Sequence, residues 1–103
     1  MKIIEYLSDK IEDEIEDAGD YAKNAIAQKD TRPWLAEVLY TLSVEETKHR
    51  QMLHDAVVRL IKEYRDNMGE PPEDMMARYD YLHERHIEDA KGVKILQTMY
   101  RES

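Results

Sequence analysis

The chain has 103 residues and a net charge of −8 at pH 7, with 37% charged and 42% hydrophobic residues, a mix typical of one domain built from long amphipathic helices. The acidic balance argues against a nucleic-acid partner, because phosphate binding requires a basic patch, and no uncharged stretch is long enough to span a membrane. The absence of cysteine excludes disulfides and thiolate metal sites, and the N-terminal residues do not resemble a signal peptide, so we expect a cytoplasmic protein.

Three helices are predicted from the spacing of apolar residues. The first spans about residues 3–28, and its apolar stripe consists of Ile4, Leu7, Ile11, Ile15, Ala18, Ala22 and Ala25. Residues 29–32 interrupt this pattern, and Pro33 suits the first turn of a second helix over about residues 33–67. Gly69 and the Pro71-Pro72 pair end the second helix, because glycine favours helix C-termini and proline cannot continue a helix.

The third helix is predicted over about residues 73–100 and opens with two acidic residues, which favour the positive end of a helix dipole. Its broad apolar stripe contains Met76, Tyr79, His83, His86, Ile87, Ala90 and Val93. Because the connection between the first two helices is short, these helices should form an antiparallel hairpin. The sequence therefore predicts an all-α fold, a long antiparallel helical hairpin plus a third helix, in a single domain over residues 1–103.

Two polar residues, Glu46 and His49, interrupt the apolar stripe of the second helix. At about 100° per residue they share a stripe with Leu35, Leu39, Leu42, Leu53, Val57 and Leu60. A carboxylate and an imidazole on a core-facing stripe lose hydration free energy unless a partner compensates them. The motif Glu-x-x-His is short, so the pair can be an ordinary intrahelical ion pair, or it can bind a metal ion.

The first helix supplies one acidic residue close to its apolar stripe, Glu14, and Tyr21 follows two turns later on the same side. The hairpin would then carry one inward glutamate on its first helix and one Glu-x-x-His on its second. Carboxylate-bridged di-metal sites in four-helix bundles use two copies of this set. Two chains related by a two-fold axis would supply both copies, so we expect a homodimer, or a higher even oligomer, that forms a four-helix bundle with the metal site at its interface.

These motifs also carry a resemblance to a known family. The spacing Glu14-x6-Tyr21-Ala22, followed after a short loop by Leu39, Val44-Glu45-Glu46-x-x-His49 and Leu53, resembles the rubrerythrin branch of the ferritin-like superfamily. The layout is most similar to the half-length, encapsulated-ferritin-like members, whose two-helix units dimerise to build a di-iron site. The resemblance covers about residues 5–62.

The resemblance implies a role for each matched residue. Glu46 would bridge two iron ions, His49 would bind one of them, and Glu14 would be the carboxylate ligand from the first helix. Tyr21 would be a nearby hydrogen-bonding or redox-active side chain, and the reaction would be oxidation of Fe(II) by oxygen or peroxide. Manganese is compatible with the same ligands. Because the chain has no cysteine and so no rubredoxin-like module, any electron donor would be external.

His83 and His86 in the third helix leave several interpretations open. They can be partly buried residues with ordinary hydrogen bonds, or one of them can bind the metal or orient a ligand. Asp80-x-x-His83 can also be a degenerate second half-site, which would allow a site within one chain. For the whole chain, two other functions stay open: a non-enzymatic helical interaction protein, whose polar residues set the register of an interface, and a ferritin-like protein that binds metal without redox activity.

Overall fold

The computed structural model describes all 103 residues, and it is entirely helical apart from the connections and the chain ends. Helix α1 spans Lys2–Gln28, α2 spans Pro33–Met68 and α3 spans Glu73–Glu102. The predicted all-α class is confirmed, and each helix boundary lies within two residues of its expected position. The four-helix bundle formed by two chains stays a prediction.

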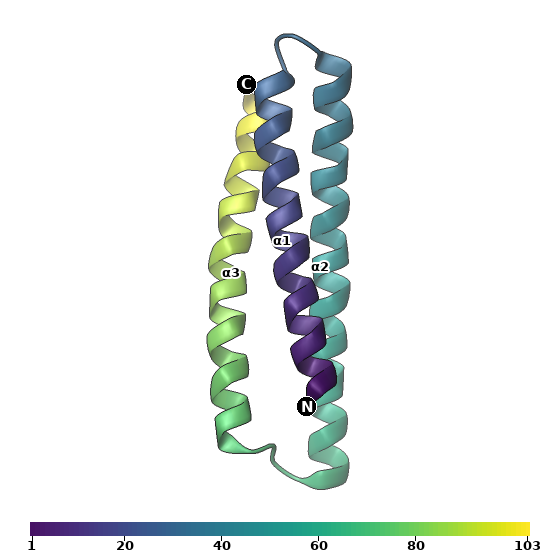
Figure 1. Cartoon of the computed structure of the whole chain (residues 1–103), viewed down its shortest axis with the longest axis vertical. Coiled ribbons are helices and arrows are strands. Elements are labelled where there is room, and N and C mark those ends of the chain that lie inside the picture. Colours follow the sequence, from purple (N-terminus) through teal and green to yellow (C-terminus); the bar gives the residue numbers. More distant parts are fainter.

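The three helices lie side by side in one elongated bundle (Figure 1) that measures 56 × 18 × 18 Å. Helix α2 runs antiparallel to α1, and α3 then returns in the same direction as α1. Helices α1 and α2 contact each other most extensively, α3 packs mainly against α1, and α2 and α3 touch least. The hairpin is therefore the main packing unit, and α3 covers one of its sides.

The two connections follow the chemistry of their residues. Pro33 occupies the first turn of α2, where its missing N–H removes no helical hydrogen bond. Gly69 ends α2 with φ of 86°, a backbone conformation that residues with a side chain adopt only at a cost. The chain then turns through Pro71 and Pro72 into α3, whose first turn carries Glu73 and Asp74 as expected from the dipole.

The core lies between α1 and its two neighbours. The main cluster is formed by Ile4, Ile11, Ile15, Ala18, Val57, Ile61 and Val93, and a smaller cluster near the α1–α2 loop is formed by Ala25, Ala36 and Tyr100. The alanines of α1 are almost completely buried. Small side chains at these positions leave room for the neighbouring helices to approach closely.

The buried line of α2 differs from the expected one. It passes through Ala36, Ser43, Val57 and Ile61, whereas Leu42 is 38% exposed. The placement of His49 on the core face was therefore wrong, because α1 packs on a line that runs to one side of it. In α3, Ile87 of the predicted apolar stripe is 39% exposed, and the buried residues are His86, Val93, Gln97 and Tyr100.

Polar contacts attach α3 to the hairpin. The Gln97 side-chain amide donates hydrogen bonds to the hydroxyls of Ser43 at 2.9 Å and Thr47 at 3.1 Å. Near the C-terminal end of α3, the Tyr100 hydroxyl donates to the Glu37 carboxylate at 2.8 Å. Burial, together with this hydrogen bond, raises the pKa of Tyr100 above its ordinary value.

The hydropathy of the three helices also bears on membrane insertion. None of them combines the length and the apolar character that crossing a bilayer requires.

Candidate metal centre

Three side chains that were predicted as metal ligands come together in the structure. One ligand atom each from Glu14 on α1 and from Glu46 and His49 on α2 lies within 4.8 Å of the other two. The His49 Nδ1 atom is 3.5 Å from Glu14 Oε2 and 3.8 Å from Glu46 Oε1. We call these three residues the Glu14–Glu46–His49 cluster.

The register of the hairpin explains why Glu14 faces Glu46. The Ser43 hydroxyl is fully buried and donates a hydrogen bond to the carbonyl of Ala18 at 2.7 Å. Because α1 and α2 are antiparallel, moving one turn forward from Ser43 brings α2 to Glu46, and moving one turn back from Ala18 brings α1 to Glu14. The two carboxylates therefore meet one turn away from this interhelical hydrogen bond.

The cluster lies at the edge of the core. The side chains of Glu46 and Glu14 are 18% and 24% exposed, whereas that of His49 is 50% exposed. The Oε2 atom of Glu14 is buried and has no hydrogen-bond donor. A buried carboxylate oxygen without a partner costs free energy, so a cation at this position would compensate it.

The donor atoms fit a metal ion in both type and spacing. Ligand atoms that bind one ion at about 2.1 Å lie roughly 3.0–3.5 Å apart, so small side-chain rotations would bring the three atoms into a coordination sphere. Two carboxylates and an imidazole suit Fe(II) and Mn(II) and do not select between them. Three protein ligands would leave further coordination positions of such an ion for another donor.

Tyr21 lies outside the cluster. It is half-buried, two turns beyond Glu14 along α1, which corresponds to about 10 Å of helix rise. Its hydroxyl forms no hydrogen bond with Glu14, Glu46 or His49. Its role in redox chemistry or hydrogen bonding therefore stays a prediction.

The structure keeps His83 and His86 apart from the cluster. His83 stacks on His54 of α2, with ring centroids 4.8 Å apart, and on Tyr79 at 5.7 Å. His86 is buried, and burial lowers its pKa in spite of the nearby carboxylates. Neither histidine supplies a ligand atom to the cluster.

The predicted second half-site does not assemble either. Asp80 is exposed, and Asp80 and His83 do not form a group of three ligand atoms with any third residue. Within one chain, the described residues therefore provide a single three-ligand cluster.

Two polar features were missed by the sequence prediction. Ser43 sits among leucines at the position where α1 approaches, and a buried small hydroxyl between large apolar residues is a signal for close helix contact. The stacking of His54 on His83 has no signal in sequence, because it depends on how α3 returns along α2.

Comparison with known proteins gives no identification. The chain matches no family model, no curated protein and no solved structure. The resemblance to the ferritin-like superfamily thus depends only on the motifs that contain Glu14, Tyr21, Glu46 and His49.

Proposed function

We propose that this protein is a di-metal carboxylate protein that oxidises Fe(II) with oxygen or peroxide, with its metal site built between two copies of the chain. The observation that carries the proposal is the Glu14–Glu46–His49 cluster, whose three ligand atoms lie within 4.8 Å of one another. Each member is a ligand that the sequence motifs predict. The buried, unpartnered Oε2 atom of Glu14 adds support, because a bound cation would satisfy it.

The surface around His49 supports the participation of a second chain. Trp34, Val38, Leu42 and Met52 lie within about 80° of one another around α2, in the same sector as His49. All four are exposed, and Trp34 and Met52 reach 69% and 70%. A two-fold related copy placed here would cover this apolar strip and bring a second Glu14–Glu46–His49 cluster opposite the first. Together the two clusters would supply the ligand set of a di-metal site.

In this proposal each residue has a separate task. Bound iron supplies the one-electron chemistry that carbon, nitrogen and oxygen side chains lack. Glu14, Glu46 and His49 would hold the iron, with Glu46 as the shared ligand and Glu14 as the second carboxylate ligand, and the two carboxylates would offset the positive charge of the ions. His49 would bind the metal through an unprotonated ring nitrogen. Tyr21 is proposed as a hydrogen-bonding or redox-active side chain near the site.

The test compares two glutamates of α2. Glu46→Ala removes a proposed ligand, whereas Glu63→Ala removes an exposed carboxylate that pairs with Arg59 at 3.4 Å, about 20 Å along the helix from His49. We expect the wild-type chain and Glu63→Ala to bind Fe(II) or Mn(II) with one metal ion per chain and to oxidise Fe(II). Glu46→Ala should lose both properties. Equal metal content, by elemental analysis, in the two variants would contradict the proposal.

Oligomeric state separates the proposed function from its main competitor. The exposed apolar strip on α2 also suits a helical interaction protein without enzymatic activity. Light scattering combined with gel filtration should detect a dimer. Leu42→Glu, two turns before His49 on the same side of α2, should convert it to a monomer with weaker metal binding. A dimer that never takes up metal would favour the interaction protein. A dimer that binds metal without oxidising Fe(II) would leave a redox-inactive metal protein.

A further inference from the structure

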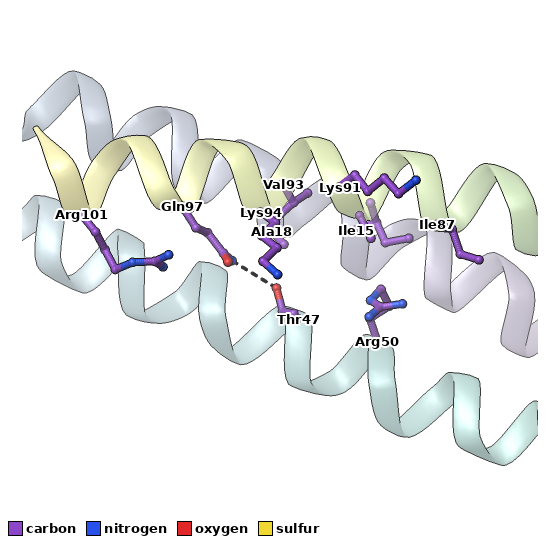
Figure 2. Close-up of a pocket in the computed structure, with 11 residues that line it drawn as sticks. Ile15, Ala18, Thr47, Arg50, Ile87, Lys91, Val93, Lys94, Gln97 and Arg101 are labelled. Carbon is purple, nitrogen blue, oxygen red and sulfur yellow. Dashed lines mark hydrogen bonds between the residues drawn. The ribbon is translucent and has the colours of Figure 1, made fainter.

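A pocket of about 490 Å³ lies between the three helices (Figure 2). It is on a different side of α2 from the Glu14–Glu46–His49 cluster, with which it shares no residue. Arg50 directly follows His49, and successive helical residues point about 100° apart, so the two side chains serve different grooves. The apolar floor of the pocket comes from Ile15 and Ala18 of α1 and from Val93 of α3. The volume falls within the range of about 300–1,000 Å³ that is usual for small-molecule sites.

The pocket is positively charged although the chain as a whole is acidic. Arg50, Lys91, Lys94 and Arg101 line it, and no carboxylate does. Only Lys91 among these four forms a salt bridge, with Glu88 at 3.3 Å, so three cations have no ionic partner. Because the chain has 23 acidic and 15 basic residues, such a group is unlike the rest of its surface. The pocket therefore concentrates positive potential beside an apolar floor.

Arg50 gives the most specific indication of a ligand. Its Nε atom is buried and has no hydrogen-bond acceptor, and its only side-chain hydrogen bond goes to Gln51 Oε1 at 3.3 Å. Figure 2 shows the Arg50 and Lys94 side chains extending into the space between α2 and α3. A guanidinium group pairs well with carboxylate or phosphate oxygens, because its N–H groups match their geometry. An anion at this place would supply the missing acceptor.

Contacts on both sides of the pocket hold α2 and α3 at a fixed spacing. On one side the Gln97 amide donates to the Thr47 hydroxyl at 3.1 Å (Figure 2). On the other side, one turn beyond Arg50, His54 stacks on His83 at 4.8 Å. The space between these contacts is thus a built feature of the fold.

We propose that this pocket binds a small amphiphilic anion, with a carboxylate or phosphate headgroup at Arg50 and Lys94 and a short hydrocarbon chain on the apolar floor. The headgroup would pair with the cations that lack partners, and the hydrocarbon would cover Ile15, Ile87 and Val93. Burial of hydrocarbon adds binding free energy that an inorganic anion cannot obtain. The proposal does not rest on the proposed metal site, because no residue of the metal cluster lines the pocket.

The experiment is isothermal titration of the full chain with four probes: octanoate, octyl phosphate, 1-octanol and inorganic phosphate. We expect saturable binding of octanoate, octyl phosphate or both, and at least tenfold weaker binding of octanol and of inorganic phosphate. The stronger of the two anionic probes identifies the headgroup. No saturable binding of either anionic probe, or equal binding of octanol, would overturn the proposal.

Matched variants locate the site. Arg50→Gln should weaken the preferred probe by about tenfold or more, whereas Arg59→Gln should bind it as the wild type does, because Arg59 is exposed on the same helix and pairs with Glu63. Ala90→Phe should block the pocket without a change of charge. Glu46→Ala should bind the probe normally even though it loses metal. Circular dichroism checks that each variant is folded, and equal affinity of the Arg50 and Arg59 variants would place the anion elsewhere.

Discussion

Without metal, the Glu14→Gln variant should be more stable than the wild type. With metal added, it should be less stable than the wild type. Without a cation, the Glu14 and Glu46 carboxylates lie within 4.8 Å of each other, and Glu14 Oε2 is buried without a donor. Glutamine has the same shape and a similar helix propensity, but it carries no charge and can donate a hydrogen bond. The variant removes a repulsion that a bound cation would otherwise relieve.

The size of the effect follows from the geometry. At the upper limit of 4.8 Å for the distance between their nearest ligand atoms, two unit charges repel by about 3.5 kcal/mol at an effective dielectric constant of about 20. Both side chains remain partly exposed and His49 lies beside them, so solvent screening reduces the expected gain to about 1 kcal/mol. For a domain of this size, a gain of about 1 kcal/mol raises Tm by roughly 4 °C.

Metal should reverse the order. A ligand at about 100 times its Kd stabilises the folded state by about 2.7 kcal/mol, which corresponds to roughly 10 °C for the wild type. Glu14→Gln loses one charged ligand per chain and should gain less than about 1 kcal/mol under the same conditions. Thermal unfolding followed by circular dichroism, with EDTA and then with excess Mn(II), measures both differences at one protein concentration.

Glu16→Gln is the matched control, because Glu16 is exposed on the same helix and outside the cluster. The Tm change of this variant measures the general effect of lowering the negative charge of the chain. It is subtracted from the Tm change of Glu14→Gln. The reasoning would be refuted by a Glu14 variant that behaves like the Glu16 variant with EDTA, together with a wild type whose Tm does not respond to Mn(II).

Three further predictions concern the packing and the titration of the bundle. Gly19→Ala and Gly92→Ala should each raise the unfolding free energy by up to about 1 kcal/mol in chemical denaturation. An added Cβ meets only ordinary van der Waals contact at Gly19 and open space at Gly92. A lower unfolding free energy for Gly19→Ala would indicate tighter helix packing. Ser43→Ala should lower the unfolding free energy by about 1–3 kcal/mol, because it removes a buried interhelical hydrogen bond, and an unchanged urea midpoint would contradict this. Burial holds the pKa values of His54 and His86 below the ordinary 6.5, so the unfolded chain binds more protons than the folded chain once the pH falls below about 6.5. Tm should therefore decrease from pH 7.5 to 5.5. The decrease should be smaller after both residues are replaced by glutamine.

The sequence predicted the helices well because their signals are local. Apolar spacing, Pro33 and Gly69 each act through the backbone of their own segment, and the observed boundaries follow them. Which residues of α2 are buried against α1 was less predictable. A broad apolar face allows several of its edges to pack, and the outcome depends on the side chains of α1 that meet it. Ser43, rather than Leu42, became the contact to α1, so His49 lies nearer to solvent than its spacing suggested.

How closely residues are connected along the chain decided which parts of the candidate site could be predicted. Glu46 and His49 are one turn apart on a single helix, so their proximity is a local property. Glu14 joined them because the hairpin is antiparallel and its loop is short, and these two facts limit the register to a few choices. The packing of α3 has no such constraint, which explains why the stacking of His54 on His83 and the basic pocket could not be foreseen.

The arrangement around α2 suggests how one helix can serve two ligands of opposite charge. Glu46 and His49 point into the groove that holds the metal cluster, and their sequence neighbours Thr47 and Arg50 line the basic pocket. Ser43, one turn before both pairs, bonds to α1 through Ala18 and accepts a hydrogen bond from Gln97 of α3. A small rotation of α2 would therefore move the carboxylates of one site and the guanidinium of the other together. If both proposals hold, saturating octanoate should change the affinity for Mn(II), and reciprocity of binding free energies requires Mn(II) to change the affinity for octanoate by the same factor.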